Sequence, residues 1–495
     1  MNSFSSNKKG LFNSSVIVYV IGTLLLLNGT LMLSCVPFAI YYDDQNHINT
    51  FLLCSLITIS FGFLLRFLTK DEKNAEIKKR DGYLIVVSGW LCMTFFGTLP
   101  YLLTDSIPSF TDAFFETMSG FTTTGSTILD EIESLPKSIL FWRSMTQWIG
   151  GMGIIVLTIA ILPLLGIGGM ELFVAEAPGP TKDKIHQRIK ETAKRLCIIY
   201  FSLTALETVV LMFLGLSFFD AINHSLTTTS TGGFSTKQQS IAAFQNPFVE
   251  AVIVIFMFLA GTNFTMIYFG LKMKFRKIVN NDEFKWYLSA VFILILLLSF
   301  YRTHTSSSDF IHAFREISFQ VVSIITTTGY ATADYTLWGS FLTFIFFLFL
   351  FSGASAGSTS GGIKIVRIIL LIKNGLLEFK RRLHPKAVIP VMLNKQVISS
   401  TITYNLLAFI FLYLFVFTLG SIFLSFLGVD MLTSISAVAS AVGNVGPGIA
   451  DVGPSSSFSQ LPTSAKWILS LLMLMGRLEL FTVCVLFTPY FWKRN

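Results

Sequence analysis

Charged residues are scarce in this chain of 495 residues. Only 13% of its residues are Asp, Glu, Lys or Arg, about half the fraction in an average soluble protein. By contrast, 53% are hydrophobic, and the mean hydropathy is +0.67. This balance excludes a soluble globular enzyme. Several uncharged stretches exceed about 18 residues, which is typical of helical membrane proteins, whereas a transmembrane barrel would show short segments of alternating hydrophobicity.

Paired cysteines and close pairs of histidines are missing as well. The five cysteines lie in apolar runs and form no CxxC pair, which excludes a disulfide framework and a zinc ribbon. The six histidines include no HExxH motif, so a zinc protease is not indicated. We therefore expect the chain to be no enzyme and to carry no cofactor of its own.

Apolar runs of membrane length predict ten spans. The seventh is the weakest, because only Trp286 to Tyr301 is free of charge. The predicted spans cover residues 16–40, 51–69, 83–103, 140–170, 196–218, 251–271, 284–301, 338–372, 397–427 and 464–492.

Basic residues are distributed unevenly about these spans. With the N-terminus in the cytosol, 28 of the 36 Lys and Arg residues fall on the cytosolic side, in segments 8–9, 70–80, 182–195, 272–285, 364–395 and 493–494. This is the positive-inside distribution of membrane proteins. We therefore expect both termini in the cytosol, a location in the cytoplasmic (inner) membrane within the lipid bilayer, and no nucleic-acid partner.

From the third span onward, each outer connection contains a second apolar segment, at 110–121, 221–226, 310–325 and 431–442. An Asp that can cap a helix stands at or near the start of each one. Each segment ends in a polar sequence with glycine, namely TTTG (122–125), STGG (230–233), TTTG (326–329) and GNVG (443–446). The final glycines recur after 108, 96 and 117 residues, which indicates an internal repeat.

These segments are too short to cross a bilayer and are candidates for re-entrant half-helices. Non-helical backbone at membrane depth is tolerated only inside the protein or beside a watery cavity. Four such segments can point their carbonyls at one axis, where they replace the hydration shell of a cation. For a single segment, close packing between helices is the better explanation. Four in equivalent positions favour an ion-selectivity filter.

We predict an all-α polytopic membrane protein with four pseudo-repeats of span, pore half-helix, filter and span around one pore. Two additional N-terminal spans occupy residues 1–80. The repeats and their filters are expected at 81–190 (filter 122–126), 191–282 (filter 230–234), 283–394 (filter 326–330) and 395–495 (filter 443–447).

In these motifs the chain resembles the Trk/Ktr/HKT superfamily of potassium transporters. TTTGST, STGGFST, TTTGYAT and GNVGPG stand at the four filter positions. The runs GGMGIIVLTIAILPLLGIGGMELF (150–173) and GRLELFT (476–482) make it most similar to the bacterial Trk-type membrane subunit. The resemblance implies K⁺ uptake through a pore in each subunit, a homodimer, and a cytosolic nucleotide-binding regulatory subunit of the TrkA type. Any nucleotide would bind to that separate subunit.

The resemblance also implies which residues bind K⁺. The filter glycines match Gly125, Gly233, Gly329 and Gly446. In relatives that favour Na⁺, serine replaces the first of these, so Gly125 argues for K⁺. Because Gly232 precedes Gly233, the register of the second filter stays open by one residue, and the fourth filter departs from the Ser/Thr pattern. The full predicted ion-binding set is Thr123, Thr124, Gly125, Thr231, Gly232, Gly233, Thr327, Thr328, Gly329, Asn444, Val445 and Gly446.

A glycine- and serine-rich sequence, SGASAGSTSGG at 352–362, interrupts the predicted eighth span. Such a composition disfavours helix, and its backbone polar groups need water or protein partners. We place it across the pore on the cytosolic side of the filter. A structural helix break is an alternative; a phosphate-binding loop is disfavoured, because the G-K-[ST] sequence is missing. The resemblance implies a gate formed by Gly353, Gly357, Gly361, Gly362 and Arg477.

Arg477 lies in an apolar span, where a charge is functional by default. The resemblance matches Arg477 with a pore-facing arginine below the filter, where a positive charge would oppose a cation and could help to hold the gate shut. Glu479 is a poor partner for it, because residues two apart point to different helix faces. The alternative is a buried ion pair with another helix.

The leading hypothesis is therefore potassium uptake through a carbonyl-lined filter with a cytosolic-side gate. The alternatives within transport are an H⁺- or Na⁺-coupled K⁺ symporter and a less selective Na⁺/K⁺ permease. A scaffold or receptor would not explain four filter sequences.

Overall fold

The computed structural model describes residues 12–69, 78–157, 182–306 and 309–493. These residues are mostly helical, and the strands among them form one short antiparallel hairpin of β1 (Met392–Leu393) and β2 (Gln396–Val397). The predicted all-α fold is therefore confirmed. Residues 158–170 of the predicted fourth span, and the basic segments 8–9 and 70–77, lie outside the described residues.

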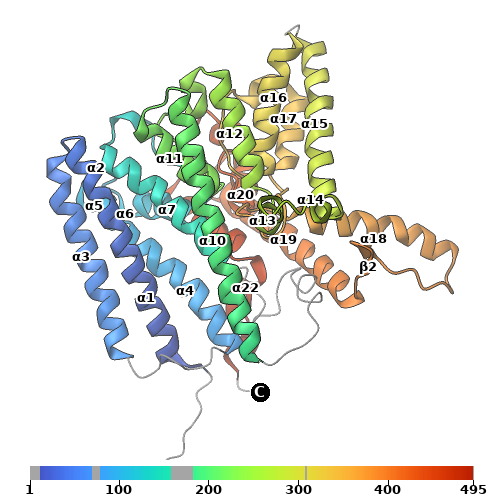
Figure 1. The fold of residues 1–495 in the computed structure, drawn as a ribbon, viewed down its shortest axis with the longest axis horizontal. Helices are drawn as coiled ribbons and strands as arrows, with labels where there is room; N and C mark the ends of the chain where they lie inside the picture. The colour runs from blue at the N-terminus through green and yellow to red at the C-terminus, as the bar shows by residue number, and fades with distance from the viewer. Residues whose placement is uncertain (1–11, 70–77, 158–181, 307–308, 494–495) are drawn as a thin grey trace, which may run out of the picture.

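The two predicted N-terminal spans lie side by side at one edge of the molecule (Figure 1). The first comprises α1 (Ser14–Met32), a single 3₁₀ turn and α2 (Val36–Tyr41), and the second is α3 (Gln45–Leu68). Glycines allow their backbones to approach closely. A Cβ on Gly22 would lie 2.8 Å from the Gly62 carbonyl oxygen, and one on Gly62 would lie 2.8 Å from the Gly22 oxygen. Small residues at such contacts are typical of helix pairs in membranes.

The remaining helices follow the predicted order of span, half-helix and span. The first repeat contains α4 (Lys79–Gly97), α5 (Leu99–Leu103), α6 (Phe110–Phe121) and α7 (Lys137–Val156). The second contains α10 (Lys182–Phe213), α11 (Phe218–Thr229), α12 (Pro247–Ala260), α13 (Phe264–Leu271) and α14 (Phe275–Val279). The third contains α15 (Asp282–Ser306), α16 (Phe310–Ile325), α17 (Ser340–Phe349) and α18 (Ile365–Leu383). The fourth contains α19 (Ser400–Phe426), α20 (Met431–Gly443), α21 (Thr463–Arg477), α22 (Leu480–Cys484) and α23 (Pro489–Trp492).

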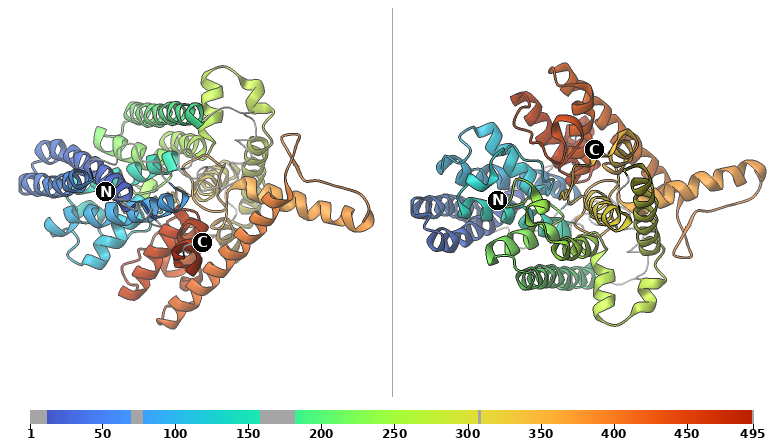
Figure 2. Two further views of the ribbon diagram at one scale, coloured as in Figure 1. Left: turned by 90° about the horizontal axis from the view of Figure 1, so that it is seen from below. Right: turned by 90° about the horizontal axis from the view of Figure 1, so that it is seen from above.

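The four repeats surround a common centre. Figure 2 shows them in chain order around it, from the cyan first repeat through the green and yellow ones to the red fourth. The half-helices α6, α11, α16 and α20 point their C-terminal ends inward and are largely buried there. The fold therefore delivers four glycine-containing loops to one place.

Polar caps set the starts of these half-helices. Ser109 and Ser217 accept hydrogen bonds from the amides of Asp112 and Asp220, while Asp430 itself accepts from Leu432 and Thr433. Asp309 occupies the N-cap position of α16 without such a bond. The expected capping hydrogen bond from an Asp side chain is therefore present only in the fourth repeat. In the first two repeats a serine caps the helix, and the Asp lies three residues later. Acidic residues in a first helical turn still stabilise its positive dipole end.

Within the described residues, six helices are long and apolar enough to cross a membrane, or eight if each sharply bent pair counts as one span. The marginal seventh span is among the six, as α15. Two of the predicted spans are sharply bent. Segment 251–271 bends by 106° between α12 and α13, and 464–492 bends by 117° between α21 and α22. The first bend contains Gly261 and Asn263, whose side chain caps α13, and the second contains Glu479 with φ of +64°.

Candidate ion pathway

The four glycine-containing loops share one backbone conformation. Each loop has a residue with positive φ at its start, Thr123 (51°), Thr231 (54°), Thr327 (57°) and Asn444 (52°). It is the second residue after the end of α6, α11 and α16 and the first after the end of α20. The glycine two residues further along each loop also has a positive φ, at Gly125 (89°), Gly233 (78°), Gly329 (81°) and Gly446 (102°). A β-branched residue such as Thr rarely adopts positive φ, and backbone strain of this kind concentrates at functional sites. The equivalence places Gly233, and not Gly232, in the register of the other three.

These glycines form a closed ring. An added Cβ on Gly125 would lie under 3.0 Å from the carbonyl oxygen of Gly232, in the next repeat. An added Cβ on Gly233, Gly329 or Gly446 would likewise lie under 3.0 Å from a carbonyl oxygen of the next repeat. These oxygens belong to Thr328, Val445 and Thr124, respectively. Each filter glycine therefore touches the carbonyl that precedes the neighbouring filter glycine. Positive φ and this close approach together explain why all four positions need glycine.

One set of carbonyls in the ring is left without a protein donor. Among the described residues, none donates a hydrogen bond to the carbonyl oxygens of Thr123, Thr231, Thr327 or Asn444. Each of the next two sets of filter carbonyls has one occupied member: Gly232 accepts from Gln147 Nε2 at 2.6 Å, and Gly446 accepts from the hydroxyls of Ser126 and Ser440. A buried carbonyl without a partner is costly, so these four oxygens are the best candidates to coordinate a cation.

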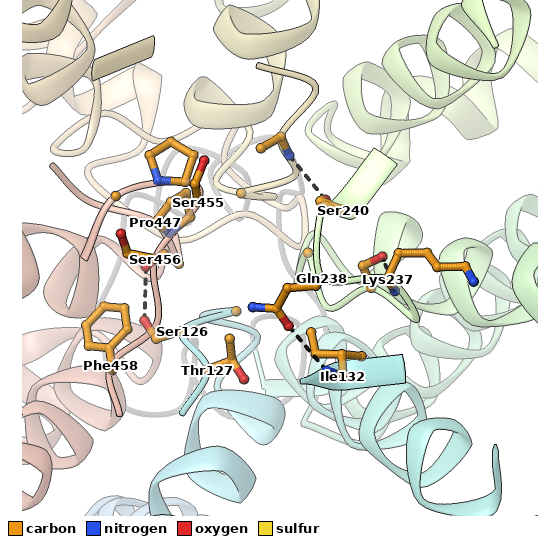
Figure 3. A pocket seen from close by; sticks show the side chains of 18 of the residues that line it. Ser126, Thr127, Ile132, Lys237, Gln238, Ser240, Pro447, Ser455, Ser456 and Phe458 are labelled. Carbon is orange, nitrogen blue, oxygen red and sulfur yellow. Dashed lines mark hydrogen bonds between the residues drawn. The ribbon is translucent and has the colours of Figure 1, made fainter. Parts of the chain in front are cut away.

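A pocket opens above the ring, and all four filter glycines line it. Figure 3 shows that its walls come from several repeats, with Ser126 and Thr127 from the first, Lys237 and Gln238 from the second and Pro447 from the fourth. The charged residues in its lining are Arg143 and Lys237. The arrangement fits an outer vestibule that leads to the ring.

A buried ion pair between α6 and α7 supports the first two filter loops. Arg143 of α7 contacts Glu116 of α6 at 2.6 Å, and both side chains are buried. Glu116 also accepts from Thr127 Oγ1 and the Ile128 amide, each at 3.0 Å, while Arg143 donates to the Ser235 carbonyl at 2.9 Å. The pair thus connects the segments that follow the first and second filters. A buried pair with additional hydrogen bonds fixes geometry even where it adds little stability.

Gln147 of α7 holds the second filter and was not among the predicted site residues. Its side-chain oxygen accepts from the Phe234 amide at 3.0 Å, and its nitrogen donates to Gly232. A Cβ on Gly232 would collide with this amide. Gly232 is therefore needed for the approach of Gln147, which explains the double glycine that left the register open.

The loop 352–362, called the gating loop below, lies directly under the ring. Gly361 donates its amide proton to Thr327 Oγ1 at 2.6 Å, and Thr359 Oγ1 donates to the Thr229 carbonyl at 3.1 Å. The loop also pairs with the bend between α12 and α13, through Ser355 to Gly261 and Phe264 to Gly357. It is non-helical, as expected, and its contacts with filter residues place it where a gate would stand.

The glycines of the gating loop are required by its path. Gly357 and Gly362 have φ of 75° and 61°. A Cβ on Gly353 would collide with the Gly361 carbonyl oxygen, and one on Gly361 would lie 2.8 Å from Asn444 Cβ.

Residues 353–357 read GASAG, the spacing of a hydrolase nucleophile elbow. That motif needs a strand-to-helix turn; here Ser355 is buried in the loop, and no histidine of the described part bonds it.

Arg477 contacts the gating loop directly. Its Nη1 donates to the Thr359 carbonyl at 2.6 Å and its Nη2 to the Gly150 carbonyl at 3.4 Å, and the residue is only 3% exposed. Glu479 turns away and pairs with Arg367 of α18 at 2.6 Å. The expectation that Glu479 does not partner Arg477 is therefore confirmed. Among the described residues, no acidic group pairs with Arg477. Its positive charge below the ring is therefore not neutralised by an ion pair.

Comparison with known proteins agrees with this geometry. Residues 47–494 match the TrkH family, described as cation transport proteins. The Trk system potassium uptake protein TrkH of Escherichia coli K12 is 40% identical over 485 residues, covering 96% of this chain and 99% of that protein. The uptake protein TrkG of the same strain is 34% identical, covering 97% and 98%.

A solved structure is similar over the whole fold. The crystal structure of the potassium transporter TrkH from Vibrio parahaemolyticus matches with a TM-score of 0.89 and 37% identity, covering 97% of this chain and 100% of that one. These relatives are transporters and not enzymes. The chain belongs to the TrkH family of cation transport proteins.

Proposed function

We propose that this protein is the membrane-spanning subunit of a Trk-type K⁺ uptake system and that K⁺ passes through the ring of four glycine-containing loops. The observation that carries the proposal is the ring itself: four loops in one conformation, each glycine against the next repeat's carbonyl. The names of its relatives agree with potassium as the transported ion.

In this proposal the ion ligands are backbone oxygens of the predicted filter residues. The carbonyls of Thr123, Thr231, Thr327 and Asn444 lack protein donors among the described residues, so a dehydrated cation can bind them without breaking existing bonds. The half-helices point their negative dipole ends at the same place. The ring thereby replaces the hydration shell that K⁺ loses.

Flux driven by the membrane potential is sufficient for accumulation. A potential of 100 mV contributes about 2.3 kcal/mol per charge, and about 1.4 kcal/mol corresponds to tenfold, so K⁺ accumulates some tens-fold without coupling. A coupled symporter would need a titratable group in the pathway. In the pocket above the ring, the charged lining residues are the cations Arg143 and Lys237, and Arg143 is already paired. This favours passive, gated transport.

The assembly follows from the family resemblance. We infer a homodimer in the cytoplasmic membrane, with both termini in the cytosol, and a cytosolic nucleotide-binding subunit of the TrkA type as regulator. The chain itself then needs no cofactor, since the nucleotide binds to the regulator. Size measurement of the purified protein, alone and with that regulator, tests both associations.

The proposal is tested with the purified protein in liposomes. Uptake of Rb⁺, a K⁺ substitute, is measured with an inside-negative potential and with none. We expect uptake that the potential increases and that external K⁺ inhibits. Rb⁺ uptake equal to that of protein-free liposomes, in a sample that remains folded, would overturn the proposal.

Asn444 supplies a further prediction about selectivity. Its side-chain nitrogen donates to Thr124 Oγ1 and to the Met473 carbonyl, each at 2.9 Å, so it joins the fourth filter to the first. Asparagine also tolerates positive φ better than most residues. Thr124→Val removes the acceptor of this bond, and we expect it to lower the K⁺/Na⁺ permeability ratio several-fold.

The equivalent residue of the third repeat provides a matched control. Thr328 forms the same local bond to Thr326 (2.8 Å) that Thr124 forms to Thr122 (2.7 Å). No side chain of another repeat bonds it within the described residues. Thr328→Val should therefore change the permeability ratio much less than Thr124→Val. Equal changes in the two variants would argue against the role of the Asn444 bond.

A further inference from the structure

Two charged side chains of opposite sign hold the gating loop from different helices. Arg477, at the end of α21, donates to the Thr359 carbonyl at 2.6 Å. Glu283, in the first turn of α15, accepts from the Ala356 amide at 2.6 Å and is 5% exposed. These two bonds, at loop residues three apart, add to the contacts of the loop with the filter and with the bend after α12. Glu283 is 73 residues away in sequence and was not among the predicted gate residues.

An arm that extends from the body of the protein is attached beside Glu283. The arm, residues 365–397, consists of α18 and the β1–β2 hairpin and projects at one side of the molecule (Figure 1). At the hairpin turn, Asn394 and Asp282 exchange two bonds, from the Asp282 amide to Asn394 Oδ1 (2.7 Å) and from the Asn394 amide to Asp282 Oδ2 (2.9 Å). Lys373 of α18 adds an ion pair to Asp282 at 3.5 Å.

The arm also binds beside the second holding residue. Arg367 of α18 pairs with Glu479 at 2.6 Å, two residues after Arg477. The arm therefore contacts Asp282, which directly precedes Glu283, and Glu479, which lies two residues after Arg477. It also continues directly from the loop, because α18 begins at Ile365. A movement of the arm would shift the first turn of α15 and the bend after α21 together.

We propose that Glu283 is a positioning residue of the gate and that the arm controls it through Asp282. This rests on the proposed function, since it assumes that the loop gates a K⁺ pathway. With the arm seated on Asp282, Glu283 holds Ala356 and the loop stays under the ring. When the arm is displaced, the first turn of α15 withdraws, the Glu283 bond breaks and the loop is free to leave the pathway.

The test compares Glu283→Ala with Glu283→Gln in the full-length protein in liposomes. The alanine variant cannot accept from Ala356, whereas the glutamine oxygen can. We expect Rb⁺ flux to rise about tenfold in Glu283→Ala, which corresponds to about 1.4 kcal/mol, and to stay within about twofold of wild type in Glu283→Gln. The K⁺/Na⁺ permeability ratio should not change in either variant, because the ring is not altered.

The hairpin supplies a second, independent pair of variants. Asn394 and Lys395 have φ of 49° and 64°, so glycine suits either position. Asn394→Gly removes the side-chain oxygen that accepts from Asp282, while Lys395→Gly makes a similar backbone change and leaves that bond. We expect higher flux in Asn394→Gly and wild-type flux in Lys395→Gly. Glu283→Ala combined with Asn394→Gly should raise flux no further than Glu283→Ala alone.

Several results would overturn the proposal. They are wild-type or lower flux in folded Glu283→Ala, equal flux in the alanine and glutamine variants, or wild-type flux in Asn394→Gly. If Glu283→Ala does not fold, the hairpin pair decides alone. Failure of the proposed function looks different: wild-type protein would then show no K⁺-inhibited Rb⁺ uptake at all.

Discussion

Replacing Gly125 with serine is expected to lower the K⁺/Na⁺ permeability ratio by roughly tenfold, which corresponds to about 1.4 kcal/mol. Gly125 has a φ of 89°, and an added Cβ would lie within 3.0 Å of the Gly232 carbonyl oxygen. The first loop must therefore move away from the second, which changes the spacing of the oxygens around the ion. Selectivity by carbonyls depends on their number and spacing.

Gly428 offers a matched control for this substitution. Its φ is 88°, almost the same as that of Gly125, but no atom lies within 4 Å of an added Cβ. Gly428→Ser therefore carries the same backbone penalty without the collision. We expect the control to retain wild-type selectivity when permeability ratios are measured in liposomes. An unchanged ratio in Gly125→Ser would count heavily against the filter assignment.

Replacing Arg477 with alanine is expected to raise Rb⁺ flux by about an order of magnitude. Arg477 is buried, bonds the Thr359 carbonyl and has no acidic partner among the described residues. Its removal deletes a charge-assisted hydrogen bond worth about 1.5–3 kcal/mol and a cation that repels K⁺. The lost bond and the cavity left by the side chain should also lower the thermal unfolding midpoint, so flux is compared at equal amounts of folded protein.

Two further variants separate the two effects of Arg477. Arg477→Lys keeps the positive charge but loses the two-pronged contact with Thr359 and Gly150, so its flux should lie between wild type and alanine. Shortening the loop within Ser352–Gly362 should also raise flux, since the loop then no longer reaches across the pathway. Lower flux than wild type in the folded alanine variant would argue against the gating role of Arg477.

Much of this arrangement could be predicted from local sequence. The half-helices at 110–121 and 310–325 have the bounds that the apolar runs predicted, because polar Thr and Gly follow each run at once. The second half-helix is longer than predicted, at Phe218–Thr229 and not 221–226, since its threonines continue the helix with hydroxyls bonded to preceding carbonyls.

Features that depend on distant residues could not be predicted. The need for a second glycine, Gly232, before Gly233 comes from the contact with Gln147, which lies 85 residues earlier in the sequence. The polar residues at the bends after α12 and α21 are too few to interrupt the apolar segments, because each bent helix pair still passes as one span by hydropathy. Hydropathy therefore cannot reveal these bends. Glu283 opens a span and resembles an ordinary acidic residue of a first helical turn; only the fold brings it to Ala356.

Selection of K⁺ by the ring is tested most directly by the zero-current potential of the purified protein in a planar bilayer, with K⁺ on one side and Na⁺ on the other. If the ring of carbonyls selects K⁺, this potential lies close to the value for a K⁺-selective pore, and Gly125→Ser moves it towards zero while Gly428→Ser does not. A wild-type potential near zero, or one that Gly125→Ser leaves unchanged, would contradict the account.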